Sequence, residues 1–447
     1  MTDSKKTIFI CVEVKSREYE SALWLGLNAV KLGFRVYIST HAGIHSVLQT
    51  KKSKSGIYFD KSTQPEKLLK EIKKKVDHIC VLDIELSPVN DEKNLNKLIP
   101  ERIYSNSLAY ISRFYVSGSI SKVISEKYIG IGKVINTGWP KWDLINEDYV
   151  KSLSKKRFRF GESKKPFLVF ASGYRFLRDP VKMSKFRNVG IIQPNERHQI
   201  EYKLHGHRLF KNCIRILENW QTSSPIIVIK PHHSESRREW KRATKHLNFV
   251  KIAKHSESLD VLLLRSEGLL HTGSTATVHA QFLNKDSFFM KEVSMIERHA
   301  VSEKLSKYLV DFKNPPRRND LSNKIDSAII NSSFDPKILD ELLTTSYPSN
   351  AQNIVRSFEG LPMHQSGYIG KAEIMVNYMS FRALKRALGL LRDEFLWFFR
   401  KTNVYSQYHA TGGWGINSYS ARRLLEKMAP NDRFNVSNIG VNIIVFE

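Results

Sequence analysis

The sequence has little cysteine. Only Cys11, Cys80 and Cys213 occur among 447 residues, and no two of them form a C-x-x-C pair. This excludes a disulfide framework, argues against a paired-thiolate zinc site and fits a reducing cytoplasm. No apolar stretch reaches the roughly 20 residues of a membrane-spanning helix, and the N-terminus has no signal-peptide pattern. We therefore expect a soluble, cytoplasmic protein.

Further absences narrow the function. The sequence shows no internal repeat, no low-complexity segment and no recognisable nucleic-acid-binding module. What it does have is an excess of basic residues, 71 Lys and Arg against 44 Asp and Glu, for a net charge of +27. Such a charge favours polyanions, whether nucleic acid, anionic lipid, or phosphorylated and acidic sugars. The plainer interpretation is a solvated basic surface with no specific partner.

Strand and helix signals alternate along the first 150 residues. Runs rich in β-formers at 8–14, 35–39 and 78–83 accompany a helical pattern at 18–33, and 103–116 holds a short helix and a strand. Strands separated by helices predict a parallel sheet. We expect residues 1–150 to form one Rossmann-like domain.

The same alternation restarts after a basic linker, since residues 151–187 contain twelve Lys or Arg and two Asp or Glu. Strands are expected at 167–171, 225–231, 249–253, 268–272 and 287–290, with helices at 200–222, 259–265 and 275–283, and the stretch 320–358 is expected to be helical. We predict a second Rossmann-like domain at 165–358. Residues 359–447 would be a helical and irregular extension.

The predicted fold class is therefore α/β, with two Rossmann-like domains facing a cleft and a helical C-terminal extension. Open α/β sheets bind ligands at the carboxyl ends of their strands. The loops that follow the predicted strands are where functional residues are expected.

One such loop is His271-Thr272-Gly273-Ser274-Thr275-Ala276, which follows a strand and opens a helix. Gly273 permits a tight turn, and Ser274 and Thr275 offer hydroxyls beside free backbone N–H groups. A helix start of this kind suits a phosphate. The alternative is a simple helix cap.

A second loop, Lys230-Pro231-His232-His233, ends the strand at 225–231. Lys230 supplies a charge, and His232 can hydrogen-bond a phosphate or protonate a leaving group near neutral pH. A solvated polar loop is the alternative. If the two strands were neighbours, His232 would lie beside Ser274 and Thr275 in a nucleotide-phosphate cradle. Because no Asp-x-Asp pair lies near these loops, we expect no catalytic metal.

Acidic candidates follow strands in the first domain. Glu18 and Arg17 lie in the first turn, and Asp83 and Glu85 end the HICVLD strand. A transferase that activates a sugar hydroxyl needs a carboxylate base. The alternatives are an ion pair that fixes the turn, and a loop or cap role for Asp83.

Taken in order, these segments resemble the bacterial surface carbohydrate biosynthesis protein family over roughly residues 7–290. The segments are VEVKSREYESALWLGLNAVKLGFRVYI, VLDIEL, NTGWPKWDLI (Gly138, Pro140, Lys141, Asp143), IKPHHSES and HTGSTATVHA. The family is similar to GT-B sialyl-, polysialyl- and Kdo transferases. The resemblance implies that Glu85 is the base with Asp83 beside it, that His232 binds the phosphate or acts as an acid, and that Ser274 and Thr275 bind the CMP phosphate.

We therefore expect a glycosyltransferase without a cofactor that moves a sugar, a CMP-activated acidic sugar being one candidate, onto an oligosaccharide or lipid-linked acceptor. The donor site would comprise Lys230, His232, Gly273, Ser274 and Thr275, and the acceptor domain would contribute Arg17 and Glu18. The alternatives are a polyol-phosphate transferase, a nucleotide-sugar epimerase, or a basic protein that binds nucleic acid or membrane. Nucleic acid is the least favoured partner. The basic amphipathic stretch 372–401 predicts either peripheral binding to the inner face of the cytoplasmic membrane or packing onto the first domain.

Overall fold

The computed structural model forms two compact units, residues 1–149 with 340–447, and residues 150–339. Each unit is described separately. The structure describes the following residues: 4–13, 15–51, 53–83, 92–145, 150–151, 167–172, 194–218, 226–232, 235–255, 257–293, 303–310, 328–330, 332–335, 337, 349–369, 373–374, 416–429, 432, 435–440 and 443–446.

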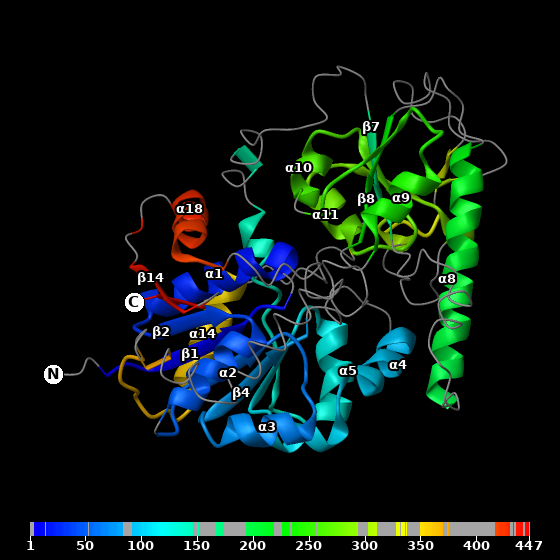
Figure 1. The fold of residues 1–447 in the computed structure, drawn as a ribbon. Helices are drawn as coiled ribbons and strands as arrows, with labels where there is room; N and C mark the ends of the chain where they lie inside the picture. The colour runs from blue at the N-terminus through cyan, green and yellow to red at the C-terminus, as the bar shows by residue number, and fades with distance from the viewer. Residues whose placement is uncertain are drawn as a thin grey trace, which may run out of the picture. The chain divides into compact units, whose positions relative to one another are not determined.

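The first unit is built on a sheet of strand order β14-β15-β2-β1-β3-β4-β5-β6 (Figure 1). Strands β1 to β6 run parallel, whereas β15 pairs antiparallel with β2. The central strand β1 (TIFIC) is buried along its whole length, as expected for an apolar run covered on both faces. The strands are β1 (Thr7–Cys11), β2 (Arg35–Ser39), β3 (Ile57–Asp60), β4 (His78–Leu82), β5 (Arg113–Val116), β6 (Val134–Asn136), β14 (Val436–Gly440) and β15 (Ile443–Phe446).

Helices connect these strands and cover the sheet. Helix α2 begins at a cap where the Thr40 hydroxyl accepts from the Gly43 N–H at 3.3 Å. The elements are α1 (Lys15–Lys31), α2 (His41–Thr50), α3 (Glu66–Lys73), α4 (Glu92–Arg102), the 3-10 helix η1 (Ser105–Tyr110), α5 (Ser119–Ile129) and the 3-10 helix η2 (Trp142–Leu144).

The C-terminal part of the chain returns to this first unit. Helix α14 (Asn350–Glu359) packs on α1, α18 (Ser418–Met428) also contacts α1, and β14 and β15 extend the sheet beside β2 (Figure 1). This division differs from the expected boundaries of 165–358 and 359–447. The physical reason is that β15 completes the backbone hydrogen bonds of β2, while α14 buries Ile354, Val355 and Phe358 against the unit. The predicted helix 372–401 lies outside the described residues apart from 373–374.

The second unit has a sheet of strand order β13-β12-β11-β10-β7-β8-β9, parallel except for β13. Its strands are β7 (Phe167–Ala171), β8 (Ile226–Lys230), β9 (Val250–Ile252), β10 (Gly268–His271), β11 (Asp286–Phe289), β12 (Tyr308–Val310) and β13 (Ala328–Ile330). Its helices are α8 (Pro194–Glu218), α9 (Arg237–Ala243), α10 (Leu259–Leu264), α11 (Ala276–Phe282) and the 3-10 helix η3 (Lys291–Val293). The buried Trp240 packs edge-on against Phe170 and Phe210 in its core.

Each sheet reverses its winding direction at one point. In the first, β2 lies on one side of β1 and β3 to β6 lie on the other, so the reversal falls between β1 and β3. In the second, β8 and β9 lie on one side of β7 and β10 to β12 on the other, so it falls between β7 and β10. The second order is that of a dinucleotide-binding Rossmann sheet, and ligands bind outside the strand ends at such points. The predicted α/β class with two Rossmann-like units is confirmed.

Among the helices of the described residues, none is both long enough and apolar enough to cross a bilayer.

Candidate functional site

The turn after β10 is rigid and lies at the reversal point of the second sheet. His271 is fully buried and joins the Ser306 hydroxyl through Nε2 at 2.8 Å, while the Gly273 N–H donates to its Nδ1 at 3.1 Å. Because Nδ1 accepts, the proton of the neutral ring is on Nε2. Gly273 has a φ of 84°, a left-handed conformation that favours glycine. The turn is therefore fixed before any ligand binds.

Ser274 and Thr275 follow this turn at the start of α11. The Ser274 hydroxyl accepts from the Ala276 N–H at 3.2 Å, and the Thr277 hydroxyl donates to the Ser274 carbonyl at 2.9 Å. Thr275 occupies the cap position, is exposed, and makes no capping bond with its side chain. The alternative of a simple helix cap thus applies to Ser274, whereas the side chain of the exposed Thr275 does not cap the helix.

Lys230, at the end of β8, holds another loop in place. Its ammonium donates to the backbone carbonyls of Lys254 at 3.0 Å and His255 at 2.8 Å. Burial lowers the pKa of Lys230 to about 8, although Glu257 opposes the shift. The geometry gives Lys230 a positioning task in the loop after β9, in addition to the charge predicted from the sequence.

Glu235, the last residue of the predicted motif at 230–235, connects three elements around His232. Its Oε2 accepts from the Ser172 hydroxyl at 2.5 Å, from the Trp240 indole N–H at 2.9 Å and from the His232 backbone N–H at 3.2 Å. Glu235 is 3% exposed. One buried carboxylate thus fixes the loops after β7 and β8. The only signal in the sequence is a glutamate three residues after His232.

The two predicted phosphate loops do not follow neighbouring strands, which corrects the expectation. Strand β7 lies between β8 and β10, so the strands that lead to His232 and to Ser274 are roughly 10 Å apart. The physical reason is the reversal of winding at β7. Ser172, directly after β7, lies between the two loops and completes the edge.

The first unit has a pocket at its own reversal point. It is lined by the ends of β1, β3 and β4, by α1, and by the segment after β6: Ile10, Cys11, Glu18, Ser21, Ala22, Leu25, Phe59, Lys61, Leu82, Trp139 and Pro140. Most of this lining is apolar, with Glu18 and Lys61 as its charged groups. Its volume is about 40 Å³, well below the roughly 300–1,000 Å³ of a typical small-ligand pocket.

Glu18 belongs to a buried charge network beside this pocket. Its carboxylate accepts from the Glu13 N–H at 2.7 Å and lies 3.5 Å from the Lys61 ammonium, which also pairs with the Glu13 carboxylate at 2.7 Å. Burial acts to lower the pKa of Lys61, but Glu18 and Glu13 outweigh it and raise the pKa. Arg17 Nε is 4.0 Å from Glu18. The structure therefore brings the predicted Glu18 to a pocket, with Arg17 at its side.

Asp83 forms an ion pair instead of facing an open site. Arg102 donates to its two oxygens at 3.0 and 2.9 Å, and Asp83 is 1% exposed. A bidentate pair of this kind holds α4 to the end of β4. Glu85, the predicted base, lies outside the described residues, as does His233.

Asp143, from the predicted GWPKWD segment, is a helix cap. It accepts from the N–H groups of Asn350 at 2.9 Å and Ala351 at 2.8 Å, at the start of α14, and from the Trp24 indole at 3.1 Å. The segment therefore secures the returning chain, while its Pro140 lines the pocket.

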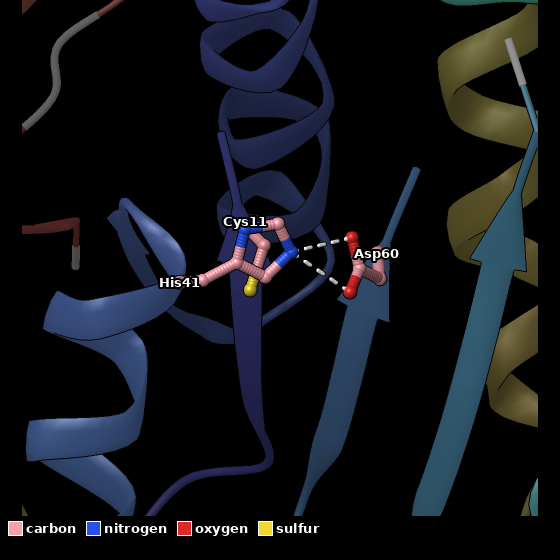
Figure 2. A group of neighbouring side chains, drawn as sticks. All are labelled: Cys11, His41 and Asp60. Atoms are coloured by element: carbon pink, nitrogen blue, oxygen red, sulfur yellow. Dashed lines mark hydrogen bonds and ion pairs between the residues drawn. The ribbon is translucent and has the colours of Figure 1, made fainter. Parts of the chain in front are cut away.

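A cluster that the sequence did not predict lies at the end of β1. Cys11, His41 and Asp60 each offer one donor atom, all within 4.8 Å of one another (Figure 2). His41 Nε2 is 3.0 Å from both oxygens of Asp60. These residues are 19 or more positions apart and meet only through sheet pairing, so no local spacing reveals them. Among the described residues, they form the group that could hold a metal ion.

By sequence, no protein-family model and no curated protein matches the chain. By structure, it is similar to Staphylococcus aureus MnaA in complex with UDP, at 12% identity and TM-score 0.45, covering 82% of this chain and 100% of that one. It is also similar to a UDP-GlcNAc 2-epimerase from Methanocaldococcus jannaschii in complex with UDP-GlcNAc and UDP. The identity is 12% and the TM-score 0.44, and the match covers 79% of this chain and 99% of that one. A third similar structure is the wall teichoic acid polymerase TagF soaked with CDPG. The identity is 11% and the TM-score 0.42, and the match covers 79% of this chain and 87% of that one.

Proposed function

We propose that the chain is a glycosyltransferase that moves a sugar from a nucleotide-activated donor to an acceptor of a surface polysaccharide. The observation that carries the proposal is the position of the Gly273-Ser274-Thr275 turn. It lies at the reversal point of a Rossmann-ordered sheet, where ligand phosphates bind in such folds. This supports a nucleotide site in the second unit.

The donor phosphates would lie over the ends of β7 and β10. The exposed hydroxyl of Thr275 and the hydroxyl of Ser274 would donate to phosphate oxygens, and His232 would approach from the β8 side. Hydrogen bonds placed before the reaction stabilise the charge that develops on a departing phosphate. His232 would also protonate that group near neutral pH. No metal is needed for this step.

The acceptor would bind against the first unit, where Glu18 and Lys61 line the small pocket and suit sugar hydroxyls. Glu85 is the proposed base, since Asp83 is occupied by Arg102. Among the described residues, Glu18 is the carboxylate that lines the pocket. It is therefore the alternative base against which Glu85 is tested.

Nucleotide binding tests the donor site first. Calorimetric titration with CMP, CDP, UDP and GDP should give one nucleotide that binds, and replacing Ser274 and Thr275 together by Ala should weaken it by roughly 1–3 kcal/mol. Ser236→Ala is the matched control, because it removes the cap of α9 in the same unit. Equal nucleotide affinity in the double variant and the wild type would reduce the turn to a helix cap.

Turnover with the nucleotide sugar so identified tests the chemistry. His232→Ala and Glu85→Gln should each lower turnover by roughly 100-fold or more while the nucleotide still binds, the usual contribution of general acid–base groups. If Glu18→Gln abolishes turnover and Glu85→Gln does not, the base is Glu18. Conversion of the nucleotide sugar to its epimer without an acceptor would instead identify an epimerase.

Association with the inner membrane surface is part of the proposal, because the chain carries a net charge of +27. Co-sedimentation should occur with anionic but not neutral vesicles and weaken with salt. Failure to bind anionic vesicles at low salt removes this part and leaves the transferase proposal intact.

A further inference from the structure

Three adjacent strands deliver the side chains of the Cys11–His41–Asp60 cluster. In the strand order β2-β1-β3, Cys11 is the last residue of β1, Asp60 is the last residue of β3, and His41 comes two residues after β2 ends. The strand register pairs Cys11 with Ser39 and Ile10 with Phe59, so the three ends are level. Ligands on the ends of paired strands are held more precisely than ligands on a loop.

Two hydrogen bonds orient the carboxylate of Asp60 and leave lone pairs for one further ligand. The Lys61 N–H donates to Oδ1 at 2.7 Å and the Tyr58 hydroxyl donates to Oδ2 at 3.0 Å. An ionised carboxylate has about four lone-pair positions, so one on each oxygen is left for the group at His41 Nε2. A cation bound there would replace the proton that the ring now shares with Asp60.

We propose that Cys11, His41 and Asp60 form a binding site for a zinc ion. A thiolate, an imidazole and a carboxylate are the three ligand types that Zn²⁺ accepts, and three protein ligands with one open position are typical of exchangeable or catalytic zinc sites. A water molecule would be the fourth ligand. The inference does not depend on the proposed transferase activity.

A second layer of contacts supports the site. The Tyr58 hydroxyl and the Lys61 N–H both orient Asp60, the arrangement that outer residues make around metal ligands. Cys80 differs: it is buried in the same sheet next to Tyr115 and is not part of the cluster.

Cobalt titration of the full-length, tag-free protein tests the site directly. Co²⁺ should give tetrahedral d–d bands and a thiolate-to-cobalt charge-transfer band, and one equivalent of Zn²⁺ should remove them. Cys11→Ser should abolish the charge-transfer band and weaken Zn²⁺ by about 100-fold or more, beyond the cost of changing an outer residue. Tyr58→Phe should weaken it by roughly 10- to 100-fold. Cys80→Ser, the matched control, should change neither.

Two results would overturn the inference. One is a wild-type cobalt spectrum without the thiolate band at millimolar Co²⁺, which needs no variant and so does not depend on how a variant folds. The other is equal Zn²⁺ affinity in Cys11→Ser and Cys80→Ser. Either result would make the cluster a His–Asp contact that joins α2 to β3. Loss of nucleotide binding or transfer has no bearing on this test.

Discussion

The two units secure the segments around their sheets by different means. In the second unit, Glu235 is local: it lies three residues from His232 and fixes the loops after β7 and β8 within one continuous stretch of chain. In the first unit, the chain leaves after residue 149 and returns at 340. Its carboxylates Asp143 and Asp77 secure the returning segment, through α14 and through His364 respectively.

The two units therefore differ in whether their stabilising contacts are local or distant in sequence. In the second unit, the contacts that hold the candidate phosphate loops come from the same continuous stretch of chain. A substitution there should therefore destabilise the second unit and leave the first unit unchanged. The pocket of the first unit is backed by segments more than 200 residues apart in sequence, as in the contact between Asp143 and Asn350. Long-range closure of this kind carries a larger entropic cost, because the loop between the contacts is longer.

The largest effect is expected from Glu235→Ala. It leaves the Trp240 indole, the Ser172 hydroxyl and the His232 N–H without their shared acceptor in a buried place. The second unit should lose about 3 kcal/mol of stability, since each buried donor without a partner costs about 1–3 kcal/mol. Hydrogen exchange should rise in peptides of β7, β8 and α9 and stay unchanged in β1 to β4.

Glu235→Gln is the control for that variant. It keeps one amide oxygen as an acceptor but loses the charge, so it should cost clearly less than Ala. Faster exchange in the first unit as well would contradict the separation of the two units.

The sequence predicted the regular part of the fold well. Strands 35–39 and 167–171 agree with β2 and β7 to the residue, because each is a buried, β-rich run between clear turns. It did not place β14 and β15, and it took 320–358 as helical although β13 lies within it. These outer strands are specified by the strands they pair with, β15 for β14, β2 for β15 and β12 for β13, more than by their own composition.

The sites were predictable only where one loop carries them. The turn at Gly273 was found from a glycine between a strand and a helix. The role of Glu235, the cap formed by Asp143, and the Cys11–His41–Asp60 cluster all depend on which strands or segments are neighbours. A single sequence does not give that order, as the mistaken pairing of the His232 and Ser274 strands shows.

A smaller effect is expected at the cap of α14. Asp143→Ala removes the acceptor for two helix N–H groups and the Trp24 indole, and should cost about 2 kcal/mol. Because burial raises the pKa of Asp143, neutral Asn should be tolerated better than Ala. Exchange in peptides covering 349–359 measures the change.

Gly138→Ala should weaken the same contact from the other side. Gly138 has a φ of 73°, and an added Cβ would lie 2.6 Å from the Asn350 side-chain oxygen. The second unit serves as the internal reference in both variants. Unchanged exchange at 349–359 in both would mean that α14 is held without this cap.

The smallest effect is expected at Asp77, and it depends on pH. Asp77 accepts from the Gly56 N–H at 2.8 Å and from the backbone and ring of His364 at 2.9 and 2.8 Å. Burial acts to raise the pKa of Asp77, but these hydrogen bonds outweigh it and lower the pKa below 3.8. A depressed carboxyl pKa adds stability above the unfolded pKa, and that stability is lost as the pH falls through the folded pKa. Asp77→Asn should therefore cost about 1 kcal/mol at neutral pH, and the difference from wild type should shrink below about pH 4. Hydrogen exchange in peptides covering 361–369, measured at several pH values, checks this prediction. If the stability difference between Asp77→Asn and the wild type stays constant with pH, the charge of Asp77 is not what holds His364.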